Sequence, residues 1–431
     1  MRHLRSNISF LKGNILILII CRVLWSWSTS IVYPFFSLYI LALGGTPPEI
    51  GLINSLGLIA GMFLYPVGGY IADRKGRVKL IGYSTYLYSL SHLLFVLAVN
   101  WQTIAIGQFL SQLLLFYMPA LTALEADSLP PEVRGRGFAL MMAIPGAIRV
   151  IAPYTGGLII TAYGGGEEGM IQAIRLCWTV AFATGILVAT IRLRYLKETL
   201  EMNEDDKPSS RSILTTLKES YRGIIDSIRW MDRPLRMILL IEVVSSFFVA
   251  MAAPFWVVYA KEALGLTPYD WGAAMLISGL VGILTAFPMG LLVDRLRPRK
   301  MILSGLSISS ICILLYIFSG GPFGVFAILP LISLSNSMMM PAFSTLIANK
   351  IPRSRRGRLF SILGERGIQI SFESFWGGGF LLFPPAAVGA LLGGYVYELN
   401  QKYLWMILSA AMASILILAH LFIKDSDETH Y

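Results

Sequence analysis

The stretch GYIADR at residues 69–74 returns later in the chain as GLLVDR at residues 290–295. A second match keeps the same spacing, because LGGTPPEIG at residues 43–51 returns as LGLTPYDWG at residues 264–272. Both copies lie in strongly hydrophobic chain. A membrane protein made of two like-oriented halves is one common plan, and its binding site lies between the halves.

The composition predicts an integral membrane protein. The chain has 431 residues, of which 55% are hydrophobic and only 14% charged, whereas about a quarter of the residues of soluble proteins are charged. Hydrophobic runs long enough to cross about 30 Å of hydrocarbon occur at 15–43, 50–72, 79–99, 103–126, 138–163, 170–192, 236–262, 271–293, 300–319, 323–348, 376–397 and 402–423. The first run is too long for a signal peptide. We therefore predict an all-α fold, with twelve transmembrane helices in two pseudo-symmetric six-helix bundles.

One long polar stretch divides the predicted spans six and six. It predicts an N-terminal bundle at 1–192, a cytoplasmic linker at 193–235 and a C-terminal bundle at 236–431. Within the linker, residues 209–230 place apolar side chains at helical spacing, which predicts an amphipathic helix on the membrane surface. A plain tether between the halves is the alternative.

The charge distribution gives the chain an orientation in the membrane. The net charge is +10, and most of the 35 lysines and arginines fall in the termini and in the loops on the same side. This asymmetry predicts a multi-pass protein of the cell membrane with both termini in the cytoplasm. It also speaks against nucleic acid as a partner. The lipid bilayer is the expected surrounding.

No motif for catalysis, nucleotide or metal is visible. The three cysteines lie within hydrophobic runs, without metal-ligand spacing, and there is no phosphate-binding G-x-x-x-x-G-K-[ST]. We therefore expect no cofactor, no metal and no enzyme. A membrane enzyme or a non-transporting receptor or scaffold remains the alternative of a different class.

The loop after the second predicted span reads GYIADRKGRVK. Gly69 permits close helix approach, and Gly76 permits a tight turn. Asp73 at the membrane edge can accept hydrogen bonds from a neighbouring helix N-terminus, where the dipole favours a carboxylate. Arg74 and Arg77 are cations for the cytoplasmic surface. A solvated basic turn is the alternative, which the repeat in the second half weakens.

This loop, in a chain of two six-span halves, resembles the signature loop of the major facilitator superfamily. The resemblance implies that the halves rock about a central site and that the loop helps to hold the cytoplasmic side closed. It assigns Asp73 and Arg77 to a latch, with Asp127 at the end of span four as the partner of Arg77. Because the second copy keeps Asp294 and Arg295 but has Arg297 and Pro298 at the positions of Gly76 and Arg77, we expect an asymmetric latch.

Two further features bear on the subfamily. The sequence APYTGG at residues 152–157 is similar to part of the drug-antiporter motif, with alanine where glycine is usual. The arginine usual in span four of proton-coupled members is missing, and Gln108 or Gln112 stands in that region. The resemblance therefore favours an exporter whose coupling uses a different carboxylate route.

Three ionisable residues lie deep in predicted spans: Arg22, Arg149 and Glu242. Each costs roughly 2.5–3.5 kcal/mol if it is unpaired in hydrocarbon, so a paired or functional role is expected. Arg22 and Glu242 stand at equivalent positions of the two halves. We assign proton coupling to Glu242, which would pair with Arg22 or Arg149 when it is deprotonated. A fixed structural ion pair is the alternative.

Polar residues in spans one, four, five, seven and ten predict a central cavity. Several follow Arg22 on one helical face, and the resemblance places spans one, four, seven and ten around the cavity. Ordinary polar packing between helices is the alternative for each. The predicted substrate and coupling residues are Arg22, Ser26, Thr29, Tyr33, Gln108, Gln112, Arg149, Glu242 and Asn336.

The two halves differ between Gly357 and Gly393, where the second half is longer. We interpret the added segment, within 357–380, as a cytoplasmic elaboration before span eleven. A broken helix inside the membrane is the alternative, because glycines and charges also mark unwound backbone at a substrate site.

The sequence predicts a secondary active transporter that moves a small organic molecule by alternating access. Proton-coupled efflux of drug-like or metabolite compounds is the leading hypothesis, with protons as the second partner and a monomer as the unit. Transport of an organic anion or a sugar, by uptake or facilitated diffusion, is the alternative, because buried arginines outnumber the buried acid.

Overall fold

The computed structural model describes residues 11–164, 166–199, 226, 228–351, 367–373 and 379–423, without the side chains of 63–75. Regular elements within these ranges are helices. Those of the N-terminal half are α2 (Asn14–Ser30), η1 (Tyr33–Phe35), α3 (Phe36–Ala42), α4 (Pro47–Lys75), α5 (Arg77–Val96), α6 (Trp101–Leu113), η2 (Leu114–Tyr117), α7 (Met118–Ser128), η3 (Pro131–Val133), α8 (Arg134–Ala162) and α9 (Gly166–Tyr195).

The C-terminal half also contributes six spans, of which the fourth is a single helix instead of two helices with a 3₁₀ turn between them. Its elements are α11 (Arg233–Ala252), η4 (Ala253–Phe255), α12 (Trp256–Glu262), α13 (Pro268–Leu296), α14 (Pro298–Tyr316), α15 (Pro322–Lys350), η6 (Phe380–Leu382), α17 (Phe383–Leu399) and α18 (Gln401–Phe422).

The twelve predicted spans are confirmed. Within the described residues, ten helical segments are long and apolar enough to cross a membrane, and α4 and α5 complete the two sets of six. Some spans contain a short 3₁₀ turn, so that α2, η1 and α3 form one span and α11, η4 and α12 form its counterpart. The predicted linker, including the amphipathic helix at 209–230, lies mostly outside the described residues.

The repeat is visible in local backbone geometry. Pro34 lies in η1 and Pro254 in η4, at equivalent places in the two halves. A proline lacks the N–H of the helical ladder, and here the helix tightens to a 3₁₀ turn. Gly76 has φ +81° after α4, and Arg297 takes nearly the same conformation, with φ +69°, after α13. The turn is therefore kept although its glycine is replaced.

Helices α4 and α13, which begin within the repeated stretches LGGTPPEIG and LGLTPYDWG, start in the same way. The Glu49 carboxylate accepts the backbone N–H of Thr46 at 2.7 Å, and the Asp270 carboxylate accepts that of Thr267 at 2.9 Å. Both pairs form capping boxes, which satisfy backbone donors that a helix start leaves free.

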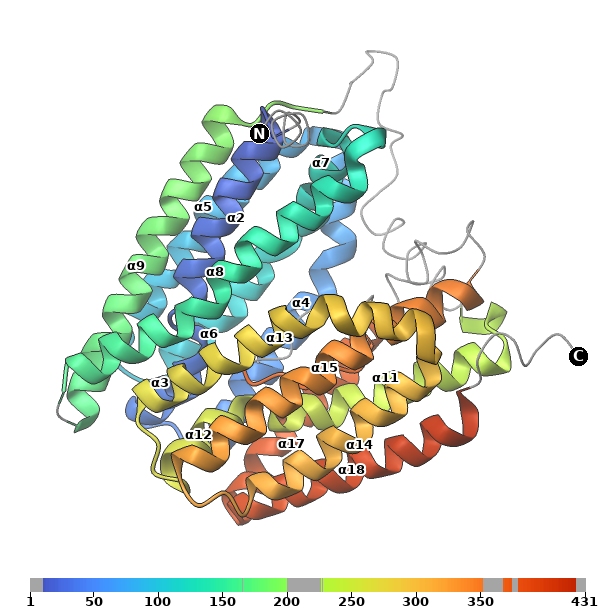
Figure 1. Ribbon diagram of the computed structural model, residues 1–431. Coiled ribbons are helices and arrows are strands. Elements are labelled where there is room, and N and C mark those ends of the chain that lie inside the picture. Colours follow the sequence, from blue (N-terminus) through green and yellow to red (C-terminus); the bar gives the residue numbers. More distant parts are fainter. Residues whose placement is uncertain are drawn as a thin grey trace, which may run out of the picture.

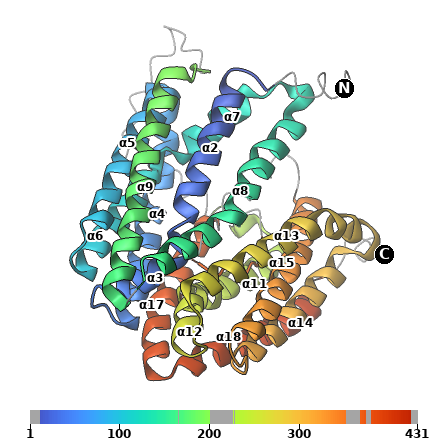
Figure 2. The ribbon, with the colours of Figure 1, turned by 60° about the vertical axis from the view of Figure 1, so that its left-hand side comes forward.

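The two halves meet on one side of the molecule and spread apart on the other. They converge near α3 and α12 and diverge towards the ends that carry the N and C termini (Figures 1 and 2). We call the latter the terminal side. On the opposite side α4 packs against α17: a Cβ on Gly51 would lie 2.6 Å from the Ala390 carbonyl oxygen, and one on Gly394 would lie 2.4 Å from that of Pro47.

The second contact between the halves joins α8 to α13. A Cβ on Gly157 would lie 2.4 Å from the carbonyl oxygen of Pro268, and one on Gly272 would lie 2.6 Å from that of Pro153. Such distances need glycine, because a side chain at either place would separate the backbones. The halves are therefore closed on the side opposite the termini.

Candidate functional site

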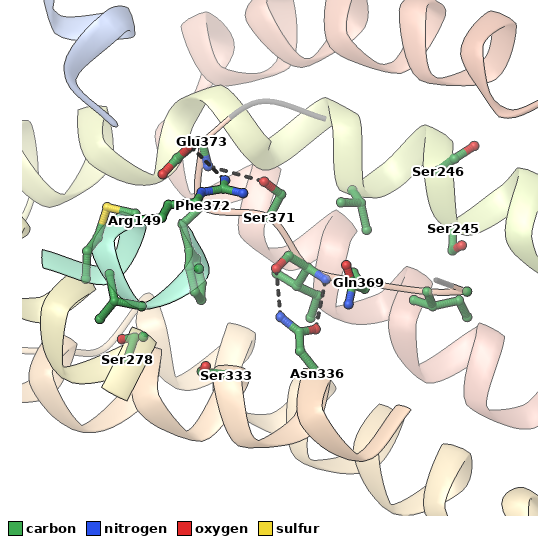
Figure 3. A pocket seen from close by; sticks show the side chains of 18 of the residues that line it. Arg149, Ser245, Ser246, Ser278, Ser333, Asn336, Gln369, Ser371, Phe372 and Glu373 are labelled. Carbon is green, nitrogen blue, oxygen red and sulfur yellow. Dashed lines mark hydrogen bonds and ion pairs between the residues drawn. The ribbon is translucent and has the colours of Figure 1, made fainter. Parts of the chain in front are cut away.

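A cavity of about 300 Å³ lies between α8 of the N-terminal half and helices α11, α13 and α15 of the C-terminal half. Figure 3 shows polar side chains from these helices pointing into it. Of the predicted residues, the structure brings three to this cavity, namely Arg149, Glu242 and Asn336. The serines that line the cavity beside them are Ser245, Ser246, Ser278, Ser333 and Ser371.

Arg149 is the cation of the cavity. It lies midway along α8, one helical turn before Pro153, which is part of the same wall. Its Nη2 lies 3.5 Å from Oε2 of Glu373, with 55% of the arginine side chain and 11% of the glutamate side chain exposed. In this structure the acid beside Arg149 is therefore Glu373, and the pairing of Arg149 with deprotonated Glu242 stays a prediction.

Glu242 forms part of the cavity wall on α11, and only 1% of it is exposed. Within the described part of the chain, neither carboxylate oxygen has a hydrogen-bond partner. The neighbouring Ser245 hydroxyl donates instead to the Glu242 backbone carbonyl at 2.9 Å. A buried carboxylate without a donor can hold a proton or meet a cationic ligand.

Arg22 has a different partner, which sequence analysis missed. Its Nε and Nη2 donate to the two oxygens of Glu125 at 2.7 and 2.6 Å, and its Nη1 lies 3.8 Å from Sδ of Met142. Glu125 is 1% exposed. In this structure Arg22 therefore pairs with an acid of its own half, since α2 packs against α7, and its pairing with deprotonated Glu242 stays a prediction.

The polar face that follows Arg22 also lies in this half. The Thr29 hydroxyl donates to the carbonyl of its own helix one turn earlier, at 2.8 Å, and Ser26 is half-buried. Tyr33 is buried, with its hydroxyl 3.5 Å from that of Tyr88. These side chains lie outside the lining of the described cavity.

Gln108 and Gln112 lie where α6 meets α4. A Cβ on Gly57 would lie 3.0 Å from Nε2 of Gln108 and 3.3 Å from Cγ of Gln112. Gln108 is 3% exposed. In this state of the protein both glutamines pack between helices and not against the cavity.

Asn336 holds a piece of extended chain in the cavity. Its Nδ2 donates to the Ile370 carbonyl at 2.9 Å, and its Oδ1 accepts the Ile370 N–H at 3.0 Å (Figure 3). We call residues 367–373 the strap. The strap has no regular secondary structure, and all of it lines the cavity.

The strap corrects the interpretation of the added segment. For residues 367–373, the predicted cytoplasmic elaboration is wrong, because Ile368 and Ile370 are buried at 2% and 3% exposure. The alternative of a broken helix came closer. Backbone without regular structure is tolerated at such a place where it is buried in protein or lines a cavity.

The predicted pairing of Arg77 with Asp127 is confirmed, since the two side chains form an ion pair between α5 and α7. The Nη1 atom of Arg77 also donates to Thr199 at 3.4 Å. The carboxylate of Glu198 accepts the backbone N–H of Val78 at 3.0 Å, which is a favourable place for an acid because the N-terminus of α5 is electropositive. Sequence analysis missed Glu198.

The remaining latch residues are less fully described. Gly69, Asp73 and Arg74 fall in the last turns of α4, whose side chains are outside the described part. Asp294 and Arg295 lie exposed near the end of α13.

Twelve membrane-spanning helices in two related halves, which close on one side of a polar cavity, define a membrane transporter. The family model described as Major Facilitator Superfamily matches residues 18–372 and, in a second match, residues 238–430. The chain therefore belongs to the major facilitator superfamily.

Curated relatives extend over most of the chain. The quinolone resistance protein NorA of Staphylococcus aureus is 22% identical over 395 residues, which are 90% of this chain and 91% of that protein. Multidrug resistance protein 2 of Bacillus subtilis is 26% identical and covers 86% of this chain, with 85% of its own length. Multidrug resistance protein MdtG of Enterobacter lignolyticus is 23% identical, with 81% of each chain covered.

Solved structures share the fold. The nucleoside transporter NupG superposes with a TM-score of 0.70 at 10% identity, over 95% of this chain and 99% of its own. A bacterial homologue of the iron transporter ferroportin, in an inward-facing state, gives 0.70 at 13% identity, over 95% and 98%.

Proposed function

We propose that this protein is a proton-coupled exporter of small organic molecules in the cell membrane, with both termini in the cytoplasm. The observation that carries the proposal is the Glu242 carboxylate, which is buried in the cavity wall without a partner among the described residues. The names of the relatives, which include quinolone and multidrug resistance proteins, support drug-like cargo. The concentration of lysine and arginine on the terminal side supports the orientation.

Exchange follows if a proton and a cationic cargo exclude each other at Glu242. In the state described here the halves are closed opposite the termini, so cargo reaches the cavity from the terminal side and the proton of Glu242 leaves to that side. The halves then rock, the cargo leaves on the far side, and a proton from there returns to Glu242. One proton enters for each cargo molecule that leaves.

We further propose that residues 1–192 and 236–431 move as two bodies joined by the linker 193–235. Arg77 and Asp127 already form their pair in the state described, in which the terminal side is open. The latch of Asp73, Arg74, Arg77 and Asp127 would therefore stabilise the state in which the terminal side is closed through contacts that are added in that state. The other predicted N-terminal polar residues would contact cargo only in a state other than the one described.

Transport into proteoliposomes with an acidic lumen tests the proposal. We expect accumulation of the quinolone norfloxacin that depends on the pH gradient. Glu242→Gln should abolish this accumulation while exchange down a norfloxacin gradient survives, because the amide cannot carry the proton. Glu398→Gln, which changes an exposed acid at the far end of α17, is the matched control. Proton-driven accumulation by Glu242→Gln would contradict the proposal.

A further inference from the structure

The strap contacts the C-terminal half at three points along its length. Asn336 of α15 holds Ile370 by two hydrogen bonds, and the ring of Phe372 stands edge-on to Trp256 of α12, with centroids 5.3 Å apart. Gly367 has φ +61°, and a Cβ there would lie 2.4 Å from Cβ of Phe343. Glu373, at the end of the strap, is therefore presented by the C-terminal half.

Arg149 comes from the other half, and Glu373 satisfies it poorly. A guanidinium offers five N–H donors in a planar fork, and a carboxylate can accept two of them in parallel at about 2.7–2.9 Å. Here one nitrogen lies 3.5 Å from one oxygen. In the described part of the chain no other partner of this guanidinium is found, and the side chain is more than half exposed to the cavity.

Charge in the cavity is therefore arranged in two parts. At one end is a guanidinium whose counter-ion is loosely held, and on α11 is the buried carboxylate of Glu242 without a counter-ion among the described residues. Serine hydroxyls and the amide of Asn336 line the same cavity. A ligand with a carboxylate and a protonated amine would complement both charges.

We propose that Arg149 binds the carboxylate of a zwitterionic cargo and that Glu373 is a built-in counter-ion which this carboxylate displaces. The proposal rests on the proposed function only in taking this cavity as the cargo site. Because Arg149 moves with one half and Glu373 with the other, displacement of Glu373 also breaks an ion pair between the halves. In the empty cavity, Glu373 thereby competes with anions for Arg149.

Equilibrium dialysis on the purified full-length protein tests this inference. The probes are norfloxacin, which has a carboxylate and a basic piperazine nitrogen, and its methyl ester, which lacks the carboxylate. Glu373→Gln should tighten norfloxacin binding about two- to fivefold, the range of a partly hydrated ion pair, and leave ester binding unchanged. Arg149→Ala should remove the preference for the acid over the ester, and Glu398→Gln should change neither.

A double substitution separates displacement from a general effect on the fold. In the Arg149→Ala background, Glu373→Gln should no longer affect norfloxacin binding. An equal effect on acid and ester, an effect that persists without Arg149, or no saturable binding of the acid by either form would overturn the proposal. Should Glu373→Gln not fold, Asn336→Ala, which releases the strap from α15, should tighten acid binding in the same way.

These binding measurements use no gradient. Failure of proton coupling in proteoliposomes would therefore leave their outcome intact, and a negative result at Arg149 would leave Glu242 as the coupling residue. The two proposals fail separately.

Discussion

At the scale of single residues, the contact of Arg22 with Glu125 is an ion pair in which two arginine nitrogens donate to the two carboxylate oxygens. Both arginine donors lie within 2.7 Å of a carboxylate that is 1% exposed. Breaking a buried ion pair by removing one partner costs about 3–5 kcal/mol, because the other charge is left uncompensated. Arg22 is itself 24% exposed, so some of that loss is relieved by water.

We expect Glu125→Gln to lower stability towards the lower end of that range, and the melting temperature of the purified protein measures it. Replacing both partners with apolar groups, as in Arg22→Met with Glu125→Leu, should restore most of the loss, since no charge is left buried. If the double variant melts as low as Glu125→Gln, the loss of stability does not come from an uncompensated charge alone.

Sequence analysis found the depth of Arg22 but not its partner. Glu125 stands close to the end of the predicted fourth span, so its position along the chain resembled a membrane-edge acid. The neighbouring positions of α2 and α7 arise from packing of the whole half, which residue spacing does not reveal. For Arg77 and Asp127 the family resemblance supplied the missing tertiary information, and that pairing is confirmed.

At the scale of elements, the latch depends on contacts from three segments. Arg77 is tied to Asp127 at the end of α7 and to Thr199 after α9, and Glu198 caps the start of α5. The matching turn in the second half keeps its backbone but has Arg297 and Pro298 in place of Gly76 and Arg77. The first turn is therefore the one built to carry an ion pair.

We expect Arg77→Ala to slow transport by up to about fivefold, since a partly hydrated ion pair is worth up to about 1 kcal/mol and only the part that differs between the two states changes their populations. Norfloxacin binding should stay normal, because the residue is outside the cavity. Initial transport rates and equilibrium dialysis distinguish the two effects. Arg295→Ala, an exposed cation of the second copy, is the control, and equal slowing of both variants would remove the asymmetric latch.

The strap shows where comparison of the halves stops being informative. Comparison of the two halves located an added segment before the eleventh span, but the first half has no equivalent segment from which its structure could be predicted. Its place depends on Asn336, whose amide matches the backbone of Ile370, and on burial of alternate apolar side chains. Neither follows from periodicity, because the strap is neither helix nor strand.

For the whole molecule, the two contacts that close the halves are related to each other by the pseudo-symmetry of the repeat. Gly51 and Gly272 are equivalent in the repeated sequence, and so are Gly157 and Gly394. The structure pairs α4 with α17 through Gly51 and Gly394, and α8 with α13 through Gly157 and Gly272. Pseudo-symmetry therefore joins each half to the other by the same pair of glycine positions.

We expect a side chain at these glycines to hold the molecule open on the side opposite the termini. For Gly394→Val, the added Cβ would lie 2.4 Å from the Pro47 carbonyl oxygen, so the backbones must separate by roughly 1 Å to restore ordinary contact. Because packed interfaces switch between discrete arrangements more readily than they stretch, the population should move towards the opposite state.

Spin labels on Leu43→Cys and Leu264→Cys, equivalent positions next to the first turns of α4 and α13, measure this opening by their separation. Gly394→Val should lengthen the distance distribution and lower norfloxacin binding from the terminal side. Gly320→Val is the control, since a Cβ on Gly320 meets open space in a loop on the same side. A distance distribution in Gly394→Val that matches the control would show that the halves do not depend on this contact to close.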